Sequence, residues 1–226
     1  MHADRWRGPE LVGIAPAYLP LTGNMTMHTL TIRNMVCDRC KAAVQRLAES
    51  HALPWKRIGL GELELEHALE PGIQEALRND LRKEGFDLVD DLAAQLVIRA
   101  KAMIIGMVHH SGLEVPKVKL SFLLSEGLHK EYSTIAALFT AVEGVTIEQY
   151  FLLQRIERVK ELIRYNELAF NEIAYRTGFS SAAHLSSQFK RITGMTPSSF
   201  KKMGRVERTA LDRVGKEWTS GLRAAI

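Results

Sequence analysis

The two cysteines of the chain, Cys37 and Cys40, are three positions apart in the stretch NMVCDRCKAAVQRL, which runs from Asn34 to Leu47. Thiolates are soft ligands, and two of them at the start of a helix are suited to Cu(I). The positive end of the helix dipole would lower the thiol pKa and favour metal binding at neutral pH. We therefore predict a metal site at Cys37 and Cys40, with Cu(I) or Zn(II) as the bound ion.

Two other interpretations of this cysteine pair remain open. The spacing also allows a reversible disulfide. The surrounding domain could instead bind no metal and serve dimerisation or a non-metal signal. Four histidines, His51, His67, His109 and His110, are not spaced to complete a zinc site with the cysteines.

The segment around the cysteines predicts a ferredoxin-like domain over residues 27–91. Alternating apolar residues indicate short strands, and apolar residues three or four apart indicate helices. The order of elements is β-α-β-β-α-β, the split arrangement of ferredoxin-like folds. The expected elements are a strand at 29–36, a helix at 37–53, two strands within 55–69, a helix at 71–86 and a strand at 87–91.

This segment resembles the heavy-metal-associated domain of copper chaperones and metal-pumping ATPases. That family has the pattern M-x-C-x-x-C at the first strand–helix turn, then an apolar helix face and a late G-F/Y. The family's glycine before the methionine is Asn34 here. The resemblance implies a ferredoxin-like fold and a soft-metal site. The matching residues are Met35, Cys37, Cys40, Val44, Leu47, Gly85 and Phe86.

Residues 92–116 are predicted to be a connector helix and linker. The helix at 92–110 has an apolar stripe, so we expect it either to dock on one of the domains or to form a homodimer interface. The N-terminal domain is a second candidate for a homodimer interface. Gln95, Arg99 and Lys101 interrupt its apolar sequence, so we do not expect it to span a membrane. Residues 1–26 are expected to be a disordered arm and residues 203–226 a flexible basic tail.

Residues 117–202 predict an all-α domain with two helix-turn-helix units. In the second unit, Gly178 supplies the turn and Phe179 lies beneath it, as in a helix-turn-helix. The first unit, from Leu120 to Val142, follows the same plan, with its turn at Gly127 and Leu128. A long helix at 146–164 joins the two units. The whole chain is therefore predicted to be α+β.

The C-terminal half resembles the DNA-binding domain of the AraC/XylS family of transcription regulators. The match lies in LLQRIERVKELI and in EIAYRTGFSSAAHLSSQFKRITGMTPSSFKK. That family has a linker helix of the type R-x-x-x-A/V-K-x-L-L, followed by I-A-x-x-x-G-F-S and later F-K-x-x-x-G-x-T-P. The resemblance implies two recognition helices that enter successive major grooves, about 34 Å apart.

The resemblance also implies which residues face DNA. Many members have Arg or Gln on the reading helices, whereas here no arginine is available for a bidentate guanine contact. Lys201 and Lys202 are additional phosphate candidates. The predicted DNA-binding residues are Ser133, Thr134, Ala136, Ala137, Ser181, Ala182, Ala183, Ser186 and Ser187 on the two helices, with Lys130, Lys190 and Arg191.

Composition is compatible with this interpretation. The net charge of +4 permits double-stranded DNA as a partner, and RNA polymerase would be a further one. Two cysteines and the absence of a signal-peptide pattern favour the cytoplasm. No phosphate-binding loop, H-E-x-x-H or nucleophile elbow occurs, so we predict no enzyme. The predicted function is a metal-responsive transcription regulator, and the alternative is a metal-carrying interaction protein.

Overall fold

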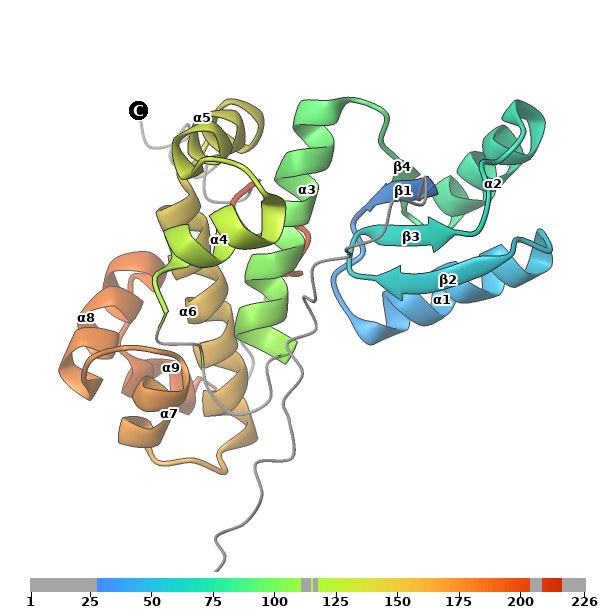
Figure 1. Ribbon diagram of the computed structural model, residues 1–226. Coiled ribbons are helices and arrows are strands. Elements are labelled where there is room, and N and C mark those ends of the chain that lie inside the picture. The colour runs from blue at the N-terminus through green and yellow to red at the C-terminus, as the bar shows by residue number, and fades with distance from the viewer. Residues whose placement is uncertain (1–27, 111–114, 116–117, 204–208, 217–226) are drawn as a thin grey trace, which may run out of the picture.

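The computed structural model describes residues 28–110, 115, 118–203 and 209–216. The predicted N-terminal arm lies outside this range, as does most of the predicted tail. Figure 1 shows a small sheet with two helices on one face, a tall helix beside it, and a cluster of helices beyond. The protein is α+β, with the sheet in the N-terminal part and only helices in the C-terminal part.

The N-terminal sheet is antiparallel, with strand order β2-β3-β1-β4. The predicted order β-α-β-β-α-β is confirmed. Strand β1 is central and pairs with both β3 and β4. The elements are β1 (His28–Arg33), α1 (Asp38–Ser50), β2 (Trp55–Gly59), β3 (Glu62–Leu65), α2 (Pro71–Lys83) and β4 (Asp87–Leu88).

Alternation along the strands explains how this sheet packs. Leu63 and Leu65 of β3 lie in one core cluster with Ile32 of β1, and these side chains are almost fully buried. Because successive side chains point to opposite faces, Glu62 and Glu64 lie on the other face. Glu64 is also buried, and there it accepts a hydrogen bond of 2.8 Å from Nε of Arg57.

The connector helix α3 (Leu92–Ile105) continues into one π-helical turn, η1 (Gly106–His110). Asp91 caps α3 by accepting a hydrogen bond from the backbone N–H of Ala94. By length and composition alone, Leu92–His110 could cross a membrane, as could the helices Tyr132–Glu143 and Ile147–Tyr165 if this strongly bent pair formed one span. Within the protein, however, Ala100 and Ile104 of α3 are fully buried. The helix is therefore part of the core.

The C-terminal part consists of two units joined by the long helix α6. Each unit has a short helix followed by a helix with an exposed face. The predicted helix-turn-helix elements and the long connecting helix are confirmed in type and order. They are α4 (Leu120–Leu128), α5 (Tyr132–Glu143), α6 (Ile147–Tyr165), α7 (Phe170–Arg176), α8 (Ala182–Thr193) and α9 (Pro197–Lys202).

The turn of the first unit differs from the prediction. Gly127 and Leu128 still belong to α4, and the left-handed residue that ends this helix is His129, with φ 51°. An added Cβ at Gly127 would lie 2.3 Å from Cε of Met103 in α3, so the flexible end of that side chain would have to move. In the second unit the left-handed residue is Gly178, as predicted, with φ 73°.

The predicted flexible tail is ordered over residues 209–216. Val214 is only 3% exposed and lies in the core that α3 forms with the first unit. The carbonyl oxygen of Leu211 accepts a hydrogen bond from Nε2 of Gln154 in α6. One apolar side chain and one backbone contact thus hold this stretch against the helical part.

Candidate nucleic-acid interface and C-x-x-C site

The two reading helices, α5 and α8, are equivalent in position within their units. Residues 131–140 and 181–190 share the same exposure class at each of ten positions, at an offset of 50. Ile135 and Leu185 are both fully buried, and so are Phe139 and Phe189. The chain therefore presents two helices with matching exposed faces.

The aromatic contacts beneath these faces repeat as well. The ring of Phe139 is 5.3 Å from that of Tyr150, and the ring of Phe189 is 5.3 Å from that of Phe200. Such edge and tilted contacts stabilise by about 1 kcal/mol beyond area burial. The single phenylalanine of each of these two helices thus packs against an aromatic ring of the helix that follows it.

The predicted DNA-facing residues fall into four groups. Ser133, Thr134 and Ala137 on α5 are exposed, as are Ala183 and Ser187 on α8. Half-buried residues are Ala136, Ala182 and Ser186. Ser181 is the N-cap of α8, where its hydroxyl accepts a hydrogen bond from the backbone N–H of His184. Three basic candidates are exposed: Lys130, Lys190 and Arg191.

One residue on this face was missed by the sequence analysis. His184 is exposed on the first turn of α8, where its Nδ1 is 2.9 Å from the hydroxyl of Ser180. Its ring also contacts Phe179 edge-on, with 5.6 Å between centroids. Helical spacing places position 184 on the same side as 180, 187 and 191. This helical spacing could have identified His184, but the prediction considered mainly small residues on this helix.

The cysteine pair lies where the loop after β1 enters α1. The Sγ atoms of Cys37 and Cys40 are 3.2 Å apart, and both side chains are partly exposed. Burial opposes ionisation of both. For Cys37, hydrogen bonds from the backbone and thiol of Cys40 outweigh burial and lower its pKa. For Cys40, burial and the neighbouring Cys37 raise the pKa. Cys37 is therefore the thiol that ionises first.

The loop that holds the cysteines is fixed from both sides. Asn34 adopts a left-handed conformation, φ 72°, in which glycine is preferred and asparagine is tolerated. Its side-chain amide donates a 2.9 Å hydrogen bond to the carbonyl of Gly85. Met35 is 3% exposed and lies in the core beneath the loop rather than beside the thiols.

The ligand count of the site is small. Within the described ranges, no three His, Cys, Asp or Glu side chains are grouped so as to hold a metal ion. A tetrahedral zinc site needs four ligands. His51 instead contacts Asp80, and His109 contacts Gln154, so neither lies at the thiols. The two sulfurs alone suit an ion that accepts two soft ligands.

The C-x-x-C loop also contacts the connector helix. Nε2 of His110, in η1, donates a 3.1 Å hydrogen bond to the carbonyl of Val36, the residue before Cys37. Nearby, Arg99 of α3 forms an ion pair with Glu62 of β3, with 3.1 Å between Nε and Oε1. These contacts join the N-terminal domain to the helix that packs into the first helix-turn-helix unit.

A neighbouring polar cluster continues from η1 into α6. Nε2 of Gln154 donates to Leu211 and to the hydroxyl of Tyr150, so its Oε1 must be the acceptor for His109. Nε2 of His109 therefore carries the proton in the neutral ring. Burial lowers the pKa of His109 to about 4, despite the opposing effects of Gln154 and Glu161. His109 is thus a neutral donor that holds η1 to α6.

Comparison with known proteins shows similarity in the C-terminal part of the chain. The profile of a family described as "Helix-turn-helix domain" matches residues 124–203. Probable transcriptional regulator LumQ of Photobacterium leiognathi is 35% identical over 69 residues, which cover 30% of this chain and 28% of that protein. The HTH-type transcriptional activator RhaR of Salmonella arizonae is 37% identical over 65 residues, covering 29% of this chain and 23% of RhaR.

Two further proteins are similar to this chain. The bifunctional transcriptional activator/DNA repair enzyme AdaA of Bacillus subtilis is 30% identical over 71 residues, 31% of this chain and 34% of AdaA. The solved C-terminal domain of the response regulator yesN from Fusobacterium nucleatum subsp. nucleatum is 28% identical, with a TM-score of 0.39, and the match covers 46% of this chain and 98% of that one.

The chain spans only about a quarter to a third of the length of these curated relatives. The match of the family profile falls on the two-unit helical part. Residues 124–203 are a helix-turn-helix DNA-binding domain of the AraC/XylS type.

Proposed function

We propose that this protein is a sequence-specific transcription regulator that places α5 and α8 in successive major grooves of double-stranded DNA. The observation that carries this proposal is the repeat of one exposure pattern on two reading helices, linked by the single helix α6. Two helices on one face of B-DNA are separated by about 34 Å, one helical turn. The domain match of residues 124–203 supports DNA as the ligand.

The reading faces suggest how the protein would recognise its operator. Small exposed residues, such as Ala137 and Ala183, let a helix approach the thymine methyl groups closely. Ser187 and His184 offer hydrogen bonds to base edges. The exposed basic side chains of Lys130, Lys190 and Arg191 would contact phosphates. Such contacts fix the position of the protein along the duplex, and their contribution to affinity falls as salt rises.

A charge introduced on the second reading helix tests this placement. The operator is first selected from a random DNA pool, and its affinity is then measured by fluorescence anisotropy at several salt concentrations. Ser187→Asp should abolish specific binding, because it places a carboxylate among base edges and phosphates. Ser50→Asp, at the end of α1, is the matched control and should bind normally. Equal affinity of Ser187→Asp and wild type would contradict the proposal.

We further propose that Cys37 and Cys40 bind a soft monovalent ion, Cu(I), as the signal. Two thiols, one with a lowered pKa, and a fixed loop support this assignment. With metal–sulfur bonds of about 2.3 Å, sulfurs on opposite sides of an ion must be farther apart than the 3.2 Å found here. Binding would therefore separate the two side chains and move the loop.

The contacts of the loop support a route by which this movement reaches DNA. The hydrogen bond from His110 to Val36 connects the loop to η1, and the ion pair between Arg99 and Glu62 connects α3 to the sheet. Because α3 packs in the same core as α4 and α5, a shift of α3 would change how the first reading helix is presented. Coupling of this kind requires metal to favour one of two arrangements.

Anaerobic titration of the reduced protein with Cu(I) and with Zn(II), against a competing chelator, tests the metal site. We expect tight one-to-one Cu(I) binding that is lost in Cys37→Ser/Cys40→Ser. Absence of binding above that variant would contradict metal sensing and would leave a DNA-binding regulator whose N-terminal domain serves dimerisation or a non-metal signal. Metal binding without any operator selected from the pool would favour a metal-carrying interaction protein.

A further inference from the structure

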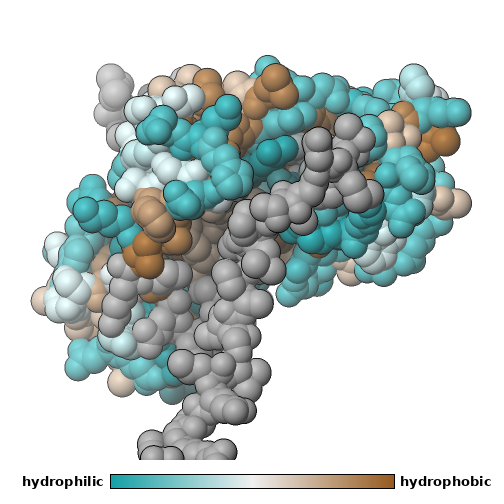
Figure 2. Space-filling model, viewed as in Figure 1, coloured by the Kyte–Doolittle hydropathy of each residue, from teal (hydrophilic) through white to brown (hydrophobic). Residues whose placement is uncertain are grey.

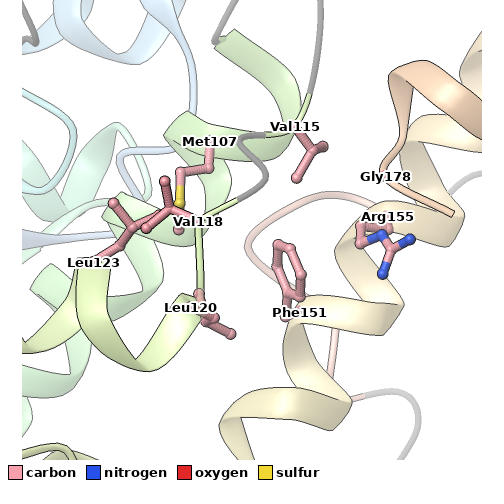
Figure 3. A pocket seen from close by; sticks show the side chains of 8 residues that line it. All are labelled: Met107, Val115, Val118, Leu120, Leu123, Phe151, Arg155 and Gly178. Atoms are coloured by element: carbon pink, nitrogen blue, oxygen red, sulfur yellow. The ribbon is translucent and has the colours of Figure 1, made fainter. Parts of the chain in front are cut away.

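A cavity of about 200 Å³ lies at the junction of the connector and the two helix-turn-helix units. Met107 of η1, Leu120 and Leu123 of α4 and Phe151 of α6 form apolar walls, as Figure 3 shows. Val118 is 51% exposed and forms part of the rim. In the space-filling view most of this face is hydrophilic, but apolar residues gather over α4 (Figure 2).

Arg155 of α6 is the one charged side chain among the described residues that line the cavity. Its Nε donates a 2.6 Å hydrogen bond to the carbonyl of Thr177, but its Nη2 is buried and has no hydrogen-bond partner. The guanidinium lies 3.8 Å from the ring centroid of Phe179 and 5.4 Å from that of Phe151. Aromatic faces compensate only part of the charge.

Among the residues that the structure describes, no carboxylate pairs with Arg155. Burial lowers its pKa to about 10, and no acidic side chain of the described ranges opposes this effect. A buried charge is ordinarily paired, because an unpaired one is costly to desolvate. The cavity thus combines apolar walls with an uncompensated cation and an unused N–H donor, which together define the complementary ligand.

We propose that this cavity binds a small organic anion with an apolar body, whose carboxylate pairs with the guanidinium of Arg155. The volume is below the range of about 300–1,000 Å³ that is typical of drug-sized ligands. The ligand class is therefore a short branched or single-ring monocarboxylate. A larger acid would not fit without movement of the walls.

Such a ligand would contact three helical elements and the turn of the second helix-turn-helix unit. The walls come from η1, from α4 of the first unit and from α6. Val115 connects these walls to the turn of the second unit, because its Cβ lies 3.3 Å from where a Cβ of Gly178 would be. An anion bound here would stiffen the junction between the two units. Its effect on DNA rests on the proposed regulatory function, whereas its binding does not.

Isothermal titration of the full chain tests the proposal with two matched pairs of probes, phenylacetate with phenylacetamide and isovalerate with isovaleramide. Each amide has nearly the shape of its acid but no charge. We expect at least one acid to bind roughly 10- to 100-fold more tightly than its amide, the range of a charge-assisted hydrogen bond. Equal affinity of acid and amide in both pairs, or no binding of either acid at millimolar concentration, would overturn the proposal.

Three variants locate the site. Arg155→Gln should abolish the preference for acid over amide. Because this change also removes the contact with Thr177, a second variant, Val118→Phe, blocks the rim from an exposed position. Val142→Phe makes the same substitution at an exposed valine of α5, 47% exposed, away from the cavity. We expect acid binding to be lost in Val118→Phe and retained in Val142→Phe, and the reverse pattern would contradict this site.

Operator affinity without any acid is measured on the same preparations. If wild type binds its operator but no acid, only this inference fails. If it binds an acid but selects no operator, the cavity stands and the regulatory proposal fails.

Discussion

His109 is held neutral in a buried position, where its Nε2 lies 3.0 Å from Oε1 of Gln154. Its side chain is 4% exposed, so protonation would place a charge in the core. The carboxylate of Glu161 is 4.0 Å from Nδ1, too far to pair closely with the ring if it were charged. This single residue therefore makes the junction between η1 and α6 sensitive to acid.

We predict that the folded protein loses stability as the pH falls from about 6.5 to about 4. The pKa of His109 is lowered from its ordinary value of 6.5 to about 4. In this window the unfolded chain gains a proton that the folded chain does not bind, which costs up to about 3 kcal/mol. Urea unfolding at a series of pH values measures the slope. The variant His109→Gln should lose less stability across the window than wild type, and parallel losses would refute this assignment.

The left-handed residues of the two turns give a second prediction at this scale. His129→Gly should raise the free energy of unfolding by about 0.5–1 kcal/mol, because glycine adopts positive φ without the strain of a Cβ. Gly178→Ala, at the corresponding turn, should lower it by about 1 kcal/mol or more, since its Cβ would also lie 3.3 Å from Val115. Chemical denaturation measures both, and a change of the same sign in both variants would contradict this explanation.

At the scale of elements, α3 is docked on the first unit through a buried ion pair. Nζ of Lys101 lies 2.7 Å from Oε2 of Glu143, and the two side chains are only 14% and 10% exposed. Burial lowers the pKa of Lys101, and Glu143 opposes this effect. Each charge thus depends on the other to remain in the core.

We predict that Glu143→Gln destabilises the protein by about 3 kcal/mol, because it leaves the Lys101 charge buried without a partner. Lys101→Met/Glu143→Gln removes both charges and should recover most of this loss. Thermal and urea unfolding of the two variants and wild type form the comparison. A double variant that is no more stable than Glu143→Gln would show that the charge pair is not the reason for the loss.

The elements themselves were largely predictable from the sequence. The alternation at Leu63 and Leu65 predicted a strand, and the spacing of Ile135 and Phe139 predicted a helix. Both patterns arise because one face of the element is buried. The turn of the first unit was misplaced, because sequence reasoning assigns a left-handed conformation to glycine and here it belongs to His129. The π-helical turn at 106–110 has no period that a pattern search would detect.

What the sequence could not reveal depends on contacts between distant segments. Val214 is a strongly buried residue of a polar tail, and its contact with the α3 core explains its burial. The arginine of the linker-helix motif was expected, but its unpaired Nη2 is visible only once the cavity walls come together. Several exposed residues of α5 and α8 were named from the sequence, but His184 was missed, and the base or phosphate that each residue contacts stays a prediction.

At the scale of the whole molecule, α3 and η1 are in contact with both halves. They touch the sheet through Arg99 and the cysteine loop through His110, and they share a core with the first reading helix. Figure 1 shows α3 standing between the sheet and the helices of the first unit. Any energetic connection between a ligand of the thiols and DNA has its most direct physical route through this element.

We predict that His110→Ala uncouples the two halves while leaving each intact. If Cu(I) changes operator affinity by the 5- to 150-fold that is typical of allosteric coupling, the ratio of dissociation constants with and without Cu(I) should move toward one in this variant. Cu(I) affinity and metal-free operator affinity should stay near wild type. His67→Ala, at an exposed histidine of the N-terminal domain, is the control. An unchanged ratio in His110→Ala would exclude this hydrogen bond as part of the route.

The burial of Val214 bears on how the protein is made. Val214 lies in the same core as Val145, 69 positions earlier in the chain (214 − 145). At translation rates of about 5–20 residues per second, the ribosome needs roughly 3–14 s to pass from one to the other. During that time the core that α3 forms with the first helix-turn-helix unit lacks Val214, whereas the N-terminal sheet already has all the strands that the structure describes. A chain cut before residue 209 would therefore lack Val214 in this core, whereas its N-terminal sheet would keep all the strands that the structure describes.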